Sequence, residues 1–284
     1  MTPKPSLEFE ALGTSWFIAR ERGISLSLEQ RVHSELKDID RVWSRFRKDS
    51  LVTKMAHEKG NYLLDAADLS LLQWYEALYL ATNGLVSPLI GHTISDAGYD
   101  ASYRLSPREH ITKTPPWDEI IAISSEGLTI KAPWLLDVGA AGKGFAVDTI
   151  AKLLGDGSYI IDAGGDILAH GPPRSIGLED PRDSKKLIGT VTIANESICG
   201  SAVNRRAWGE WHHIINPDTS LPAEDVIATW VIAESAMKAD GIATALFFVS
   251  PETLKSLGAF SYIIMYANGK VYHTNNNAVT LFTS

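Results

Sequence analysis

The chain has 284 residues, 45% of them hydrophobic and 21% charged, a balance typical of a soluble globular protein. Its formal net charge of -8, with no cluster of lysine and arginine, argues against nucleic acid as the main partner. No segment supplies the roughly 18 consecutive apolar residues of a membrane span.

Length and cysteine content set two further expectations. Residues 1–284 are expected to form a single domain with two lobes, because mixed folds of this size are often one body. The opening stretch MTPKPSLEFEALGTSW lacks a basic segment followed by an apolar one, and Cys199 is the only cysteine. Both features favour a location in the cytoplasm.

The first predicted elements are a strand and a helix. Alternating apolar residues predict a strand over residues 7–18 that is interrupted at residues 12–14. Apolar residues at helical spacing then predict a helix over residues 27–46. Ser27 and Gln30 form a plausible capping box at its start.

A second helix and a long irregular segment follow. The helix is predicted over residues 65–82, with Asp65 at its start and Asn83 and Gly84 after its end. Residues 86–118 are rich in Pro, Gly, Ser and Tyr and show little periodicity. We interpret that segment as a functional loop or as the junction between the lobes.

The second half of the chain mixes short strands with two helices. Because the order of the elements is irregular, we expect an α+β fold of mixed sheets and helices rather than a doubly wound parallel sheet. Strands are predicted at residues 120–123, 128–130, 159–161, 189–193, 211–215, 228–232 and 262–266, and helices at residues 143–154 and 235–248.

A glycine-rich loop, DVGAAGKGFAVD, occupies residues 137–148. It is not a P-loop, since Gly144 stands where that loop needs a serine or threonine. It is not a dinucleotide fingerprint either, because Val147 replaces the third glycine. The loop either contacts a ligand or is a tight turn into a helix with Lys143 exposed to solvent.

Two glycines interrupt the strand pattern at Gly164 and Gly165, in the sequence YIIDAGGDIL. Such a pair indicates a bulge or a surface that a ligand approaches closely. A hairpin turn is the alternative.

The sequence WHHIINPDTS places two adjacent histidines before a turn. In a strand, His212 and His213 would point to opposite faces, so at most one of them can face a shared site. The turn-forming residues 216–219 would bring His213 to a sheet edge or cleft, where an imidazole can exchange a proton near neutral pH.

Asp240 and Thr244 are four residues apart and therefore share one face of the predicted helix, among small residues. A carboxylate and a hydroxyl are hard oxygen ligands that suit Mg²⁺. A buried hydrogen bond from the aspartate to the backbone is the structural alternative.

Taken together and in order, these motifs resemble the ApbE family, the FAD:protein FMN transferases. The resemblance implies a fold of two lobes with an FAD cleft between them. It also implies a reaction in which Mg²⁺ assists transfer of FMN from FAD to a threonine or serine hydroxyl of a target flavoprotein, releasing AMP. The similar segments are residues 12–14, 137–148, 163–166, 197–205, 212–222 and 239–245.

The resemblance also implies roles for individual residues. The implied catalytic residues are His213, a candidate general base, with Asp240 and Lys143. The implied Mg²⁺ ligands are the main-chain carbonyl of Gly142 and the side chains of Asp240 and Thr244. The implied FAD-binding residues are Leu12, Gly13, Thr14, Lys143, Gly164, Gly165, Ser201, Arg205 and His213.

The chain departs from the family pattern in several segments. Residues 139–142 read GAAG where the family commonly has GGIA, and Ala202 and Asn204 replace a glycine and an aromatic residue. Residues 86–89 read VSPL where FDPT is usual, so an acidic residue near the flavin is missing. Two alternatives therefore accompany the transferase prediction: an FAD pyrophosphatase that gives FMN and AMP, and a flavin-binding protein without turnover.

Overall fold

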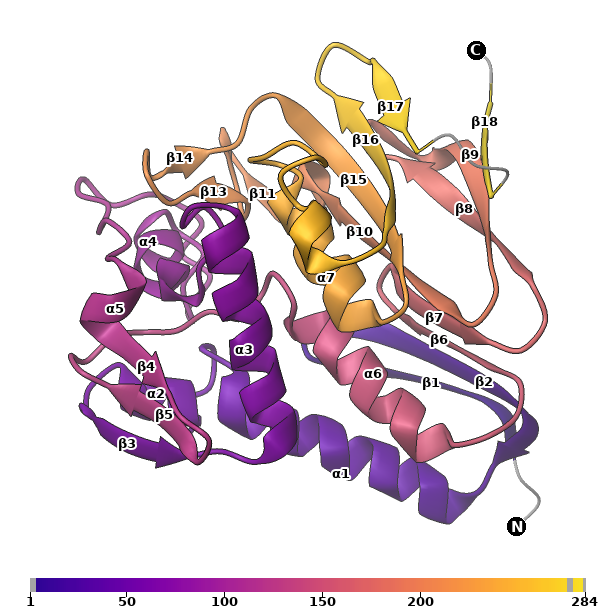
Figure 1. Ribbon diagram of the computed structural model, residues 1–284, viewed down its shortest axis with the longest axis horizontal. Helices are drawn as coiled ribbons and strands as arrows, with labels where there is room; N and C mark the ends of the chain where they lie inside the picture. Colours follow the sequence, from indigo (N-terminus) through magenta and orange to yellow (C-terminus); the bar gives the residue numbers. More distant parts are fainter. Residues whose placement is uncertain (1–3, 275–277, 283–284) are drawn as a thin grey trace.

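The computed structural model describes residues 4–274 and 278–282 (Figure 1). At its centre is an eight-stranded sheet with the order β1-β2-β6-β7-β10-β15-β16-β17, in which all neighbouring strands are antiparallel. Its strands are β1 (Lys4–Ala11), β2 (Thr14–Ile24), β6 (Tyr159–Ala163), β7 (Asp166–His170), β10 (Glu196–Ala202), β15 (Val226–Ala233), β16 (Ser261–Tyr266) and β17 (Val271–His273).

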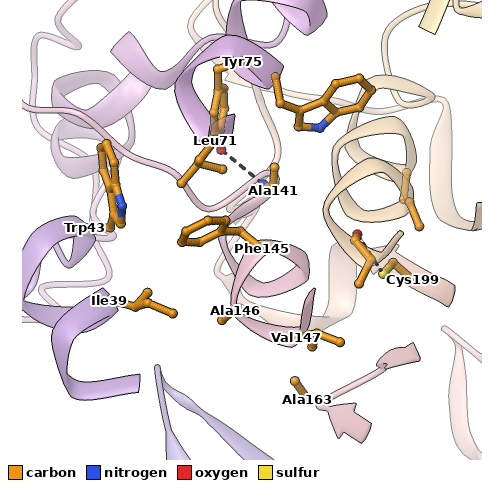
Figure 2. Packing of buried hydrophobic residues seen from close by; sticks show 14 of the residues in the cluster. Ile39, Trp43, Leu71, Tyr75, Ala141, Phe145, Ala146, Val147, Ala163 and Cys199 are labelled. Atoms are coloured by element: carbon orange, nitrogen blue, oxygen red, sulfur yellow. Dashed lines mark hydrogen bonds between the residues drawn. The ribbon is translucent and has the colours of Figure 1, made fainter. Parts of the chain in front are cut away.

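Helices cover one face of this sheet (Figure 1). The helices α6 and α7 pack against each other and against the sheet, while α1 packs on α6 and α3 on α7. Their apolar side chains form the main core with residues such as Ile161 and Cys199, and Figure 2 shows part of it. These helices are α1 (Leu26–Trp43), α3 (Ala66–Ala81), α6 (Gly142–Leu154) and α7 (Ala236–Ala245).

A three-stranded sheet with the order β18-β9-β8 packs on part of the opposite face. Its contact with the central sheet is a second apolar cluster that includes Leu178 and Val191 from the small sheet and Ile167 and Ile198 from the large one. The strands are β8 (Arg174–Asp180), β9 (Asp183–Ile193) and β18 (Val279–Leu281).

The remaining elements are short. A small sheet with the order β3-β5-β4 lies beside the first helices, and two pairs of very short strands follow β10. They are α2 (Leu51–Met55), β3 (Gly60–Leu63), η1 (Pro88–Ile90), α4 (Gly91–Asp96), α5 (Trp117–Ile120), β4 (Ile121–Ile123), β5 (Gly127–Ile130), η2 (Val203–Arg205), β11 (Ala207–Trp208), β12 (Trp211–His212), β13 (Ile215–Asn216), β14 (Leu221–Pro222) and η3 (Lys255–Leu257).

The structure confirms the expected mixed fold and most elements, but it corrects the start of α1. Ser25, not Ser27, is the N-cap: its extended backbone lies outside the helix and its hydroxyl accepts a hydrogen bond from Leu28 N at 3.2 Å. The predicted capping box at Ser27 is therefore wrong. Asp65 caps α3 as predicted, accepting from Asp68 N at 2.8 Å.

Both predicted strand interruptions are hairpin turns. Leu12 and Gly13 have φ values of 51° and 71°, and the chain reverses there between β1 and β2. Gly164 and Gly165 have φ values of 64° and 99° and connect β6 to β7. Two consecutive positive φ angles fit a tight two-residue hairpin. Glycine adopts such angles without a steric penalty, which suits Gly13, Gly164 and Gly165 to these turns.

The predicted strand over residues 211–215 is wrong. Its first two residues pair with β11 and its last pairs with β14, so the chain changes partner at His213. The strands predicted at residues 120–123 and 128–130 form, but in the small sheet rather than the central one. The division into two lobes near residues 86–118 stays a prediction. Among the described residues, no helix has the length and apolar character to cross a bilayer.

Candidate active site

A cavity of about 790 Å³ opens on the helix-covered side of the central sheet, and we call it the large cavity. Its volume falls within the range of small-molecule sites, about 300–1,000 Å³. The predicted site residues that line it are Leu12, Gly13, Thr14, Gly142, Lys143, Gly164, Ser201, Arg205, His213, Asp240 and Thr244. Gly165 instead lines a neighbouring cavity of about 680 Å³.

The packing of α6 on α7 fixes two of these segments relative to each other. A Cβ atom on Gly144 would lie 2.2 Å from the carbonyl oxygen of Ala236, so the two helices can approach this closely only with glycine there. Asp148 on α6 accepts hydrogen bonds from Ala236 N at 2.8 Å and Met237 N at 2.9 Å. Helix α6 therefore caps the start of α7, which carries Asp240 and Thr244.

Lys143 lies between two buried carboxylates. Its Nζ donates to Asp166 Oδ2 at 2.5 Å and to Asp240 Oδ1 at 3.4 Å. The two aspartate side chains are 1% and 2% exposed, whereas that of Lys143 is 21% exposed and reaches the cavity. Burial acts to lower the pKa of Lys143, but Asp166 and Asp240 outweigh it and raise the pKa, so the ammonium stays charged.

Asp240 combines burial with a nearby like charge. Its Oδ2 accepts a hydrogen bond from Gly144 N at 3.0 Å. Burial and then the Asp166 carboxylate raise the pKa of Asp240 to about 7, against the opposing effect of Lys143. A cation bound nearby would stabilise the charged form of this buried carboxylate, so Asp240 is suited to be a cation ligand.

Thr244 faces other oxygen atoms. Its Oγ1 lies 3.5 Å from the carbonyl oxygen of Ala140 and 3.5 Å from Ser201 Oγ. Gly142 is the first residue of α6, and carbonyls at this position normally point along the helix. The Gly142 ligand stays a prediction, while the carbonyl beside Thr244 is that of Ala140.

The oxygen set fits a hard cation such as Mg²⁺ in chemical type. Within residues 4–274 and 278–282, no three His, Cys, Asp or Glu side chains come together as a metal site. A metal here would therefore depend on one carboxylate with hydroxyl and carbonyl oxygens, and on groups from a ligand.

Helix α3 supports the glycine-rich loop from behind. The phenol oxygen of Tyr75 accepts hydrogen bonds from the N–H groups of Ala140 and Ala141, both at 3.1 Å. Tyr75 is fully buried, and Figure 2 shows its ring pointing at Ala141 across the core. The loop is thus held in place by a helix distant in sequence.

The two histidines have different roles. His212 Nε2 lies 2.8 Å from the carbonyl of Ala223, and its Nδ1 accepts from Ile214 N at 3.2 Å, so this ring is structural. His213 lines the large cavity, and its buried Nδ1 has no hydrogen-bond partner in the described part of the chain. Burial and then Arg206 lower the pKa of His213 to about 3, so its imidazole is neutral.

An arginine and an aspartate that sequence reasoning did not assign also line the large cavity. Arg45 Nε donates to Asp137 Oδ2, and the guanidinium lies 4.2 Å from the ring centre of Phe46 and 5.0 Å from that of Tyr99. Burial acts to raise the pKa of Asp137, but Arg45 and the Gly139 N–H keep it below its usual range. Arg45 lies inside the helix predicted over residues 27–46 but beyond the observed end of α1 at Trp43, and no local pattern indicated its contact with Asp137.

The segment interpreted as a functional loop does contribute to the large cavity. Its lining residues are Val86, Ser87, Ile90, Ile94, Tyr99 and Tyr103. Ser87, which stands in the segment where an acidic residue is usual, uses its hydroxyl to accept from Leu89 N at 3.2 Å. Across the cavity, a Cβ on Gly164 would lie 1.9 Å from Thr14 Oγ1, so the two hairpin turns touch there.

Sequence comparison identifies relatives over most of the chain. The sequence model described as the ApbE family matches residues 12–262. A protein of Klebsiella pneumoniae (strain 342) named FAD:protein FMN transferase is 25% identical over 250 residues, covering 80% of this chain and 77% of that protein. A protein of Treponema pallidum (strain Nichols) with the same name is 27% identical, covering 83% and 76%.

Two solved structures share the fold. The flavin transferase ApbE from Vibrio cholerae aligns with a TM-score of 0.77 at 20% identity, covering 95% of this chain and 96% of that one. The ApbE protein from Thermotoga maritima aligns with a TM-score of 0.79 at 22% identity, with the same coverage of the two chains.

Proposed function

Because the chain belongs to the ApbE family, we propose that it transfers FMN from FAD to a threonine or serine hydroxyl of a target flavoprotein and releases AMP. The observation that carries the proposal is the large cavity, which gathers all the predicted site residues but Gly165. The relatives named FAD:protein FMN transferase support the same reaction.

In this reaction the hydroxyl oxygen of the acceptor forms a bond to the FMN phosphorus. The bond from that phosphorus to the AMP oxygen breaks, AMP leaves with the electron pair, and the hydroxyl gives up its proton. The protein must therefore hold the pyrophosphate, align the hydroxyl and provide a place for the proton.

We assign Mg²⁺ to the oxygen atoms of Asp240, Thr244 and one loop carbonyl. The resemblance implies the carbonyl of Gly142, but Ala140 is the better candidate, since its oxygen lies 3.5 Å from Thr244 Oγ1. When bound, Mg²⁺ supplies positive charge to the pyrophosphate oxygens and so favours attack at phosphorus. An acidic chain can bind anionic FAD in this way.

Lys143 contributes a second positive charge toward the pyrophosphate. Its raised pKa keeps it protonated, and its bond to Asp166 fixes the ammonium at the cavity wall. The remaining FAD contacts are assigned to Leu12, Gly13, Thr14, Gly164, Ser201 and Arg205, which all line the large cavity. A contact of Gly165 with FAD stays a prediction of the resemblance, because Gly165 lines the neighbouring cavity.

His213 is assigned to the acceptor hydroxyl. His213 lines the large cavity and its imidazole is neutral, so the ring can accept a hydrogen bond from that hydroxyl and then its proton. Phosphate groups bound nearby favour the imidazolium form, which raises the pKa from its low value in the free protein.

The decisive experiment is co-expression with candidate flavoproteins, followed by mass spectrometry of each one. The expected result is a covalent FMN adduct on one threonine or serine with the wild-type chain and none with Asp240→Ala. An adduct that forms equally with the variant would contradict the metal assignment.

Incubation with FAD and Mg²⁺ alone separates the alternatives. Steady release of FMN and AMP without an acceptor indicates the pyrophosphatase, with water as the nucleophile. FAD that survives incubation with Mg²⁺ and every acceptor indicates a flavin-binding protein. A cytoplasmic acceptor stays a prediction of the sequence.

A further inference from the structure

A second cavity, of about 680 Å³, lies on the other face of the central sheet, and we call it the strand-side cavity. Strand residues point alternately to the two faces of a sheet. On β10, Ser201 points toward α7, where its hydroxyl meets that of Thr244, while its neighbours Gly200 and Ala202 belong to the opposite face. The floor of the strand-side cavity includes Phe17, Ile167, Ile198 and Trp230, and its side wall comes from β8.

The two cavities share a rim at one end of the sheet. The residues that line both are Ser15, Gly164, Gly200, Ser201, Ala202 and Arg205. Ser201 is the important member, because its Oγ lies 3.5 Å from Thr244 Oγ1 in the proposed metal site. A chain lying in the strand-side cavity can therefore reach the metal site by crossing this rim.

The lining of the strand-side cavity disfavours a nucleotide. Of the described residues that line it, Glu8, Glu10, Asp162 and Glu179 carry carboxylates and Arg205 alone carries a positive charge. Arg205 is itself engaged, since its Nη2 lies 3.4 Å from Glu179 Oε2. An anionic ligand such as FAD or AMP would be repelled, whereas a peptide with neutral or basic side chains would not.

The wall of this cavity offers a strand edge. Among the described residues, β8 pairs with β9 alone and ends its sheet. Ile176, Gly177 and Glu179 of β8 line the cavity. An extended peptide can add to such an edge through main-chain hydrogen bonds, with its side chains reaching the apolar floor.

We propose that the strand-side cavity binds an extended segment of the acceptor protein, with neutral or basic residues around the threonine or serine whose hydroxyl crosses the shared rim. This inference rests on the proposed function, since only the transferase needs to bind an acceptor protein. It separates the two substrates by face: FAD binds on the helix side of the sheet and the acceptor on the strand side.

The first test uses Phe17→Ala, because Phe17 is half-buried and lines the strand-side cavity but not the large one. The probe is a synthetic peptide spanning the hydroxyl residue that gains FMN in the co-expression experiment. Loss of the phenyl contact is expected to raise KM for this peptide by about tenfold, with kcat and the Kd for FAD within about twofold of wild type.

The matched control is Tyr272→Ala, which removes an aromatic ring that is 53% exposed on β17 of the same sheet and lines neither cavity. Its KM is expected to equal that of wild type. An unchanged KM for Phe17→Ala, or equal changes in the two variants, overturns the docking proposal. A wild-type chain that labels no acceptor overturns the proposed function and the docking proposal with it.

A charge reversal gives a second, independent test that does not depend on packing. Glu179 is partly exposed, so Glu179→Lys should fold normally. Two versions of the peptide, with lysine or glutamate beside the hydroxyl residue, are compared. Wild type is expected to prefer the lysine peptide and Glu179→Lys the glutamate peptide. The same preference in both proteins would overturn the proposal.

Discussion

The ammonium of Lys143 is bound 2.5 Å from the carboxylate of Asp166, which is almost completely buried. Lys143 comes from the start of α6 and Asp166 from the start of β7. Asp240 of α7 is the second carboxylate, with its Oδ1 at 3.4 Å from Lys143 Nζ. Asp166 Oδ1 has no hydrogen-bond partner within the described ranges, so Lys143 carries most of the compensation for this buried charge. The cavity wall is thus built on a charge cluster of one cation and two anions.

Removing the Asp166 charge tests this cluster. We expect Asp166→Asn to lower the free energy of unfolding by about 2–3 kcal/mol, because Lys143 loses its nearest counter-charge in a buried position. The rate of FMN transfer should fall as well, since the ammonium is no longer fixed. Urea unfolding and transfer assays measure the two effects.

The control is Asp183→Asn, which breaks the exposed pair with Lys186. Exposed pairs contribute about 0–1 kcal/mol, so this variant should unfold nearly as wild type does. Equal destabilisation by the two substitutions would show that burial of the Lys143 pair has no energetic consequence.

The proposed metal site predicts a specific loss for Thr244→Val. Valine keeps the shape of threonine but removes the hydroxyl beside Ala140. With FAD present, the affinity for Mg²⁺ should fall by about tenfold, the equivalent of 1.4 kcal/mol, as measured by calorimetry. Thr229→Val is the matched control: its hydroxyl donates to the carbonyl of Ala243 at 2.7 Å, outside the cavity. That variant should lose about 1 kcal/mol of stability and bind Mg²⁺ normally.

The contact between α6 and α7 predicts that alanine at Gly144 lowers the free energy of unfolding much more than alanine at Gly142, two positions earlier. In Gly144→Ala the new Cβ meets the backbone of Ala236 at 2.2 Å, so the helices must separate, at about 3 kcal/mol or more. In Gly142→Ala the nearest atom is a side-chain carbon of Val138 at 3.1 Å, and the change should be within about 1 kcal/mol. Denaturant unfolding of both proteins decides, and equal stabilities would contradict the close helix contact.

Asp68 predicts a pH dependence of stability. Burial raises the pKa of Asp68 to about 6, although its Oδ1 accepts a hydrogen bond from Trp43 Nε1 at 2.6 Å. Because the pKa in the folded state exceeds the ordinary aspartate value of 3.8, the stabilising contribution is complete below pH 3.8 and is lost as the pH rises through 6.

Asp68→Asn removes this titration and keeps an oxygen acceptor for the Trp43 N–H. Relative to wild type, the variant should gain about 1 kcal/mol between pH 4 and pH 7, after allowance for partial solvent exposure. The measurement is denaturant unfolding at a series of pH values, with Asp38→Asn as an exposed control. A stability difference that does not change with pH would contradict the raised pKa.

The sequence predicted those elements whose apolar residues recur at a regular spacing. The apolar residues of α1 recur at helical spacing, and Leu28, Val32, Leu36, Ile39 and Trp43 are all buried as that spacing requires. The strand predicted over residues 211–215 failed because its apolar residues do not show which neighbour each one pairs with. Trp211 pairs back with Trp208 and Ile215 pairs forward with Pro222, so the chain forms two short hairpins instead of one strand. β8 and most of β9 were missed because their exposed polar residues show no simple alternation.

The candidate site was predictable as a set of motifs but not as a set of contacts. Gly13, Lys143, Asp240 and His213 were identified from the motifs, and all four line the large cavity. The charged partners of Lys143 and of Asp137 were not identified from the sequence. Asp166 is 23 positions from Lys143, and Arg45 is 92 from Asp137, so neither pair leaves a periodic signal in the sequence.

The glycine-rich loop has the reverse polarity of a phosphate-binding loop. Phosphate loops bind anions because their backbone N–H groups are free. Here the N–H groups of Ala140 and Ala141 are taken by Tyr75, that of Gly142 by the carbonyl of Val138 at 2.7 Å, and that of Gly144 by Asp240. With these donors already engaged inside the protein, the loop atom that lies near Thr244 is an acceptor, the carbonyl oxygen of Ala140. The phenol of Tyr75 therefore leaves a loop that resembles a phosphate-binding loop in sequence with fewer N–H donors free to bind an anion.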